Sequence, residues 1–161
     1  MSQQIGPFKR MLSSAGGLRL GMNLWPPFLF SGARILHISP DFAHVRVRLA
    51  KTPLTSNYFG TQFGGSLFSM TDPFWVIMLA RNLGPDYIVW DRRGEIDFVA
   101  PGTTAVTSEL VLPREVIDEV RAAADGGEKV LRWFENDVVD SDGTTIARVR
   151  KQVYVRRKPT R

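Results

Sequence analysis

The sequence predicts a single α+β domain in which one long antiparallel sheet curls around a central helix. The apolar segment of residues 67–83 is hydrophobic on nearly every side, which is typical of a helix buried all around. A hairpin pattern precedes this segment, and several strand-like runs separated by turn signals follow it. A chain of 161 residues is long enough to bury such a core as one domain.

Composition excludes several kinds of chemistry. The chain has no cysteine, so thiolate nucleophiles, zinc ribbons and dithiol redox centres are excluded. Its two histidines are too few for a histidine-rich metal site, and a Ser-His-Asp triad would have to use one of them. We therefore expect no metal.

The charge balance favours acidic partners. The chain has 21 Lys and Arg against 16 Asp and Glu, a net charge of +5, which does not by itself require nucleic acid. RNA-binding signatures are absent from the sequence, and we expect no nucleic-acid partner. The first residues lack the pattern of a secretory signal, and no apolar run reaches the length of a membrane span. We expect a cytoplasmic protein with no membrane partner.

The N-terminal segment predicts one helix and one extended stretch. Residues 5–15 have apolar side chains at helical spacing, and Gly16 and Gly17 follow as a stop signal. Residues 25–30 contain two prolines, which lack amide donors and restrict the residue before each, so we expect an extended apolar segment there. Gly32 should end it.

A hairpin follows. Residues 43–49 alternate between apolar and polar side chains, and residues 33–38 precede them across a turn at residues 39–41. Symmetric closure of this hairpin would set His37 opposite His44. The two imidazoles then either share a proton or a metal or form a solvated cross-strand pair, since two ligands alone rarely make a metal site.

The second half of the chain predicts four strand-like runs and one surface helix. Residues 113–124 fit that helix, with proline at its start and glycines after its end. The runs are residues 87–90 with 95–100 joined by a turn at Arg93-Gly94, then 103–112, 128–139 and 144–157.

The last run places basic side chains on one face of its strand. This face either attracts phosphates or an acidic carrier protein, or is a solvated sheet surface. One face has Arg148, Arg150, Gln152, Tyr154 and Arg156, and the other has Ala147, Val149, Val153 and Val155.

The Gly-rich stretch before the buried helix carries the chemistry. Gly64 and Gly65 let the backbone approach a ligand, and free amides at the start of a helix suit a developing oxyanion. The alternative for this pair is a simple tight turn. Asn57 either holds a water molecule or satisfies its own loop.

Asp72 is the acid of the predicted helix, and two roles are open for it. It can act as a base or a nucleophile, or it can cap a helix that begins at Pro73. A kink at Pro73 would allow the helix to start near Leu67 and still present the acid.

Residues 57–72 resemble the signature of hotdog-fold thioesterases, in particular the phenylacetate-type acyl-coenzyme A thioesterases. That signature is Asn, several residues, Gly-Thr, a variable residue, His-Gly-Gly, and a helix with an acid. The likeness covers roughly residues 31–157, and residues 96–102 resemble the strand of that superfamily that ends in a proline turn. It is greatest to a branch described as a domain of unknown function, which has Phe-Gly-Gly-Ser. The matching residues are Asn57, Gly60, Thr61, Phe63, Gly64, Gly65, Leu67, Phe68 and Asp72.

The resemblance implies a hotdog fold for residues 31–161, after an N-terminal segment of residues 1–30, within one globular domain. It also implies a homodimer or homotetramer with its site between chains. The implied activity is hydrolysis of an acyl-coenzyme A or acyl-carrier thioester, with coenzyme A as part of the substrate and no other cofactor. An acyl carrier protein is then a candidate partner.

The resemblance assigns roles to individual residues. Backbone amides at Gly64 and Gly65 would polarise the thioester carbonyl, and Asp72 of the other chain would activate water or attack directly. A non-catalytic module that binds acyl groups or coenzyme A is the alternative, since Phe63 replaces the histidine of the signature. The implied catalytic residues are Asp72, Asn57 and Gly65, and the implied substrate-binding residues are Phe63, Gly64, Ser66, Phe68 and Thr61.

Overall fold

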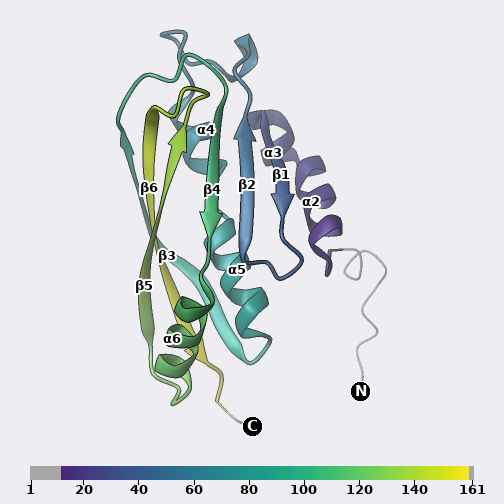
Figure 1. The fold of residues 1–161 in the computed structure, drawn as a ribbon, viewed down its shortest axis with the longest axis vertical. Coiled ribbons are helices and arrows are strands. Elements are labelled where there is room, and N and C mark those ends of the chain that lie inside the picture. Colours follow the sequence, from purple (N-terminus) through teal and green to yellow (C-terminus); the bar gives the residue numbers. More distant parts are fainter. Residues whose placement is uncertain (1–11, 160–161) are drawn as a thin grey trace.

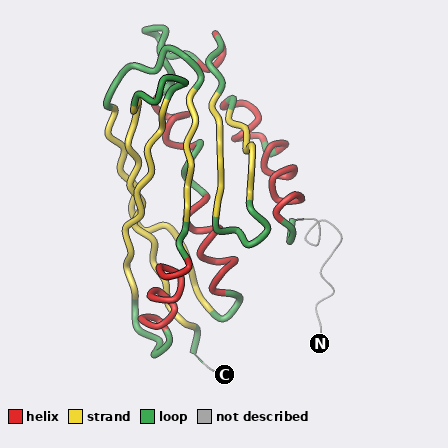
Figure 2. Tube along the Cα trace, in the orientation of Figure 1, coloured by secondary structure: helices red, strands yellow, loops and turns green. Residues whose placement is uncertain are grey.

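The computed structural model describes residues 12–159 and confirms the expected α+β architecture (Figure 1). A six-stranded antiparallel sheet curves along one face of a central helical segment, and its strand order is β1-β2-β4-β5-β6-β3. Figure 2 separates the strands, in yellow, from the helices, in red. The strands are β1 (Ala33–Ile38), β2 (His44–Leu49), β3 (Tyr87–Phe98), β4 (Val106–Val111), β5 (Val130–Val139) and β6 (Thr145–Arg157).

Strand alternation builds the core. Along β6 every second side chain is buried, and the intervening ones are more exposed, as expected for a sheet with one wet face. The buried row packs against the central helical segment, whose Phe74, Met78 and Leu79 are fully buried. The predicted surface helix is present as α6 (Arg114–Ala124), with Ile117, Val120 and Ala124 buried.

The central segment is two helices joined by a turn. α4 (Gly64–Ser69) ends before a turn at residues 70–73, and α5 (Phe74–Leu83) continues from Pro73. Proline has no amide donor, so the helical hydrogen-bond ladder is interrupted there. The expected kink at Pro73 is confirmed, and it presents Asp72 within the turn.

Two expectations for the N-terminal segment are wrong. Helix α2 (Ala15–Leu24) runs through the two glycines that were expected to stop a helix, because Ser14 caps it and Leu18 and Met22 are buried. Residues 5–11 of the expected helix lie outside the described residues.

The apolar segment that follows is helical rather than extended. α3 (Pro26–Ser31) places its prolines at the first two helical positions, where no amide donor is needed. Gly32 ends the helix as expected, in a left-handed conformation with φ of 80°.

The expected turn at Arg93-Gly94 is also wrong. β3 continues through it as one strand paired with β6, and a bulge between Asp91 and Arg93 absorbs the extra residue. In the β1–β2 hairpin a similar irregularity after Ile35 sets His37 opposite Arg46 rather than His44.

The two edges of the sheet differ. At the β1 edge, the side-chain amide of Asn23 in α2 accepts from Ile35 N at 2.7 Å and donates to Ile35 O at 3.0 Å. α2 and α3 therefore cover this edge, as Figure 1 shows. Within the described residues, β3 pairs only with β6, so its outer edge is open. No helix in residues 12–159 has the length and apolarity needed to cross a membrane.

Candidate functional site

Asn57 organises the loop before α4. Its Oδ1 accepts from Phe59 N at 2.9 Å and Thr61 N at 3.1 Å. Its Nδ2 donates to Thr61 Oγ1 at 2.8 Å and to Gln62 O at 3.3 Å. These hydrogen bonds show that the Asn57 side chain stabilises the conformation of its own loop. A role in holding a water molecule remains a prediction.

Aromatic rings pack closely over Gly64 and Gly65, and neither glycine needs an unusual backbone conformation. A Cβ atom on Gly64 would lie 2.8 Å from the Phe98 ring, and one on Gly65 would lie 2.5 Å from the Phe63 ring. Neither glycine has a positive φ. Within the described residues, neither amide donates to another group, so both remain available to an acceptor.

The two glycines line different hollows. Gly65 lines a groove of about 420 Å³ with Phe63 and Ser66, and Phe30 of α3 forms part of its wall. Gly64 lines a second groove, of about 360 Å³, together with Asn57 and Thr61. The residues of the first groove are Phe30, Ser31, Leu54, Thr55, Ser56, Phe63, Gly65, Ser66 and Ser69.

Asp72 forms an ion pair instead of capping a helix. Its Oδ1 lies 2.5 Å from Lys151 Nζ, and its side chain is 47% exposed. α5 has no side-chain cap, so the capping alternative is wrong. Oδ2 of Asp72 makes no hydrogen bond within the described part of the chain.

Lys151 is buried between two carboxylates. It lies on β6 with 4% of its surface exposed, and its Nζ is also 3.2 Å from Asp91 Oδ2. The ring of Phe68 is centred 5.3 Å from the same ammonium group. Burial raises the pKa of the Asp91 carboxyl, and the Lys151 charge opposes that change.

Gly94 makes room for this cluster. A Cβ atom there would lie 2.6 Å from Phe68 Cζ and 3.2 Å from Lys151 Cδ. β3 therefore approaches α4 and β6 closely enough to bring Asp91 to the ammonium group. Phe68 thus packs beside the ion pair, away from the groove in which Phe63 lies.

The sequence prediction missed Lys151 and Asp91. Lys151 stands between Val149 and Val153 in the alternating pattern, so strand alternation alone places its charge on the buried face. A charged residue in an apolar row is the signal that would have found it. Asp91 was hidden by the expected turn two residues later.

The two histidines approach each other without forming a metal centre. Their ring centroids are 5.3 Å apart, and His44 Nε2 lies 3.7 Å from Glu109 Oε2. Within residues 12–159 no group of three or more histidine, aspartate or glutamate side chains has the arrangement of a metal site.

The expected basic face of β6 is largely neutralised. Arg148 pairs with Asp137 at 2.8 Å, and Arg150 pairs with Glu95 at 3.3 Å. Glu135 lies 3.5 Å from both arginines. This surface is therefore a mixed-charge, solvated sheet face rather than a basic patch.

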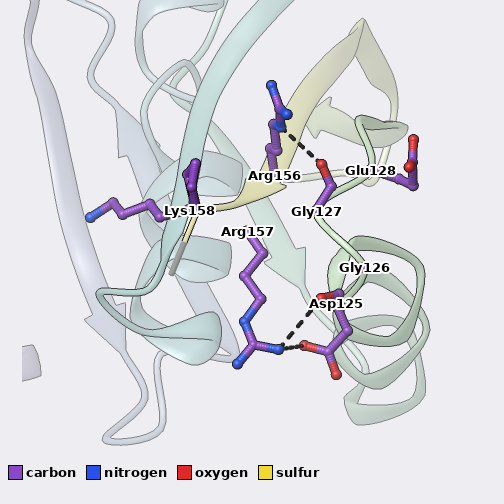
Figure 3. A pocket seen from close by; sticks show the side chains of 8 residues that line it. Asp125, Gly126, Gly127, Glu128, Arg156, Arg157 and Lys158 are labelled. Carbon is purple, nitrogen blue, oxygen red and sulfur yellow. Dashed lines mark hydrogen bonds and ion pairs between the residues drawn. The ribbon is translucent and has the colours of Figure 1, made fainter. Parts of the chain in front are cut away.

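The basic side chains of a polar pocket at the end of β6 also have partners within the chain (Figure 3). Arg157 pairs with Asp125 at 3.0 Å, and Arg156 donates to Gly127 O at 2.9 Å. Lys158 Nζ donates to Pro85 O at 2.5 Å. Each of these three side chains is therefore already engaged by an oxygen atom of the chain.

Comparison with known proteins gives a family and a fold. The family model described as a domain of unknown function (DUF4442) matches residues 18–155. None of the curated proteins compared with the chain matches it.

Three solved structures have the same fold. A protein of unknown function from Pseudomonas aeruginosa, described as a probable thioesterase, is 19% identical with a TM-score of 0.77, over 86% of this chain and 93% of that one. A thioesterase from Haemophilus influenzae is 12% identical with a TM-score of 0.65, over 89% and 91%. A protein of unknown function from Chlorobaculum tepidum is 12% identical with a TM-score of 0.69, over 91% and 98%. The hotdog fold expected from the sequence is confirmed.

Proposed function

This chain belongs to the DUF4442 family, and from that membership and the geometry above we propose that it hydrolyses acyl thioesters of coenzyme A or of an acyl carrier protein. The observation that carries the proposal is the Asp72 carboxylate. It is half-exposed at the kink of the central helical segment, where one oxygen is held by Lys151 and the other is unengaged in the described residues.

The reaction uses water as the nucleophile. Asp72 accepts a proton from water as the water oxygen bonds to the thioester carbonyl carbon. The carbon–sulfur bond then breaks, and the thiolate takes up the proton. The products are a carboxylic acid and a free thiol.

Gly65 supplies the opposing half of the site in this proposal. Its amide, which has no acceptor within residues 12–159, donates to the developing oxyanion. Phe63 and Phe30 of the same groove contact the acyl group, and Ser66 also lines that groove. A second copy of the chain supplies Asp72 across a dimer interface.

A second candidate is a binder of acyl thioesters without chemistry. The ion pair itself favours it, because Asp72 also serves to compensate the buried charge of Lys151. In that case the Asp72 carboxylate has a structural role, and the groove binds the acyl thioester without hydrolysing it.

Wild-type protein distinguishes these candidates. It is incubated with short, long and aromatic acyl-coenzyme A substrates while free thiol is followed, and the affinity of each is measured by calorimetry. Thiol release above the uncatalysed rate supports the hydrolase. Binding without release supports the second candidate, and the absence of both refutes the proposed function.

A further inference from the structure

The fold of the sheet does not require a lysine at position 151. The buried row of β6 is otherwise apolar around it, with Val149 and Val153 fully buried on either side. A buried ammonium group is costly unless it is paired, so an apolar side chain would suit this site better for stability alone.

The surroundings of Lys151 are built to hold its charge. Asp72 comes from the turn between α4 and α5, and Asp91 comes from the bulged part of β3. Phe68 of α4 presents its ring to the ammonium group, and Gly94 of β3 leaves space for both side chains. Three separate elements thus converge on one nitrogen.

We propose that Lys151 is the positioning residue of the site, with Asp91 as the group that limits its effect on Asp72. This deepens the proposed function and rests on Asp72 being the general base. Lys151 fixes Oδ1 of Asp72, which leaves Oδ2 turned to the reacting water.

Asp91 is needed because a lysine alone would weaken the base. An adjacent cation stabilises a carboxylate and so lowers its affinity for a proton. Asp91 shares the same ammonium group, and the three side chains together carry one net negative charge. Lys151 therefore divides its charge between two carboxylates instead of acting on Asp72 alone.

Titration of Asp72 in charge-altered variants tests this directly. The charged groups that face Asp72 among the described residues are Lys151 from β6 and Asp91 from β3, while α4 contributes the neutral Phe68. Lys151→Met removes the cation and should raise the Asp72 pKa by about 1 unit, the lower end of the range for a nearby opposite charge. Asp91→Asn should lower it, and the double variant should return it toward the wild-type value.

Carbon NMR of the labelled Asp72 carboxyl group gives the readout without any substrate. Arg148→Met is the matched control, because it removes a cation from the outward face of the same strand. It should leave the Asp72 titration unchanged. If Lys151→Met does not fold, the direction of the Asp91→Asn shift decides the matter alone.

The activity profile adds a second readout. The acid limb of kcat/KM against pH should move in the same direction as the NMR titration in each variant, because the base must be deprotonated. An Asp72 titration that is unchanged in Lys151→Met and in Asp91→Asn would overturn the inference. Expected NMR shifts in a protein that hydrolyses no thioester would uphold the positioning of Asp72 and refute the hydrolase.

Discussion

Lys151 has two carboxylate partners, so losing one and losing both should have very different effects on stability. Asp72→Asn or Asp91→Asn alone leaves the ammonium group one partner, and we expect each to cost about 1 kcal/mol. The double variant leaves a buried unpaired charge, which costs about 3–5 kcal/mol. Urea unfolding measures all three, and Asp118→Asn, which breaks an exposed pair with Arg114, is a control. Additive effects would contradict the shared-partner arrangement.

Gly94 should tolerate no side chain. In Gly94→Ala the new methyl group meets the Phe68 ring and the stem of Lys151, so we expect a loss of about 1–3 kcal/mol. Gly126→Ala places its methyl group in open space and should change the free energy of unfolding little. Thermal unfolding of the two variants compares them, and equal stabilities would show that β3 can move away from α4.

Only the part of the candidate site that lies in one continuous stretch of sequence could be predicted. Local spacing identified Asp72, Gly64 and Gly65 because they lie in one continuous stretch of sequence. Lys151 and Asp91 join that stretch only through the pairing of β3 with β6, which is set by tertiary contacts rather than by local sequence.

At the level of elements, two glycines near helix ends should have opposite effects on stability when each is replaced by alanine. Gly16 lies inside α2 with open space beside it, so Gly16→Ala should stabilise the protein by about 0.5–1 kcal/mol. Gly32 ends α3 with a positive φ, and a Cβ there would lie 2.5 Å from Thr55 Cγ2, so Gly32→Ala should destabilise it. Chemical denaturation tests both, and a destabilising Gly16→Ala would contradict the observed course of α2.

Helix α2 and strand β3 both continue through residues whose local preference is to end them, and for the same physical reason. Helix α2 passes through glycine because burial of Leu18 and Met22 outweighs a weak local preference. β3 passes through Arg93-Gly94 because long pairing with β6 outweighs a turn signal. In both cases tertiary packing overrode a local preference, which for a glycine within a helix is worth about 1 kcal/mol.

At the scale of the whole molecule, the part of the chain that the structure describes has one covered sheet edge and one open edge. Asn23 satisfies the backbone of β1 at Ile35, whereas the outer edge of β3 has no partner in the described chain. An open edge of 12 residues is a template for pairing with another chain. The order of strands that creates this asymmetry could not be read from local patterns, although the curved sheet around a central helix could.

We therefore expect at least a dimer formed through β3. Light scattering at micromolar concentration should give at least twice the mass of the chain. Phe98→Lys adds a charge to this strand and should weaken the dimer, whereas Val111→Lys, which is similarly exposed on β4, should not. A monomeric wild-type protein would contradict the proposal that two copies of the chain share one site.

The central claim is that Asp72 is the reacting base, and its most direct test is the hydrolysis rate of Asp72→Asn on a thioester that the wild-type protein turns over. Lys151 keeps Asp91 as a partner in this variant, so the fold and the affinity for the thioester should be retained. We predict a loss of ~100- to 10,000-fold in kcat with near-normal binding, while Asp86→Asn, at an exposed aspartate outside the cluster, hydrolyses at the wild-type rate. An Asp72→Asn protein that folds, binds and hydrolyses as fast as wild type would contradict the account.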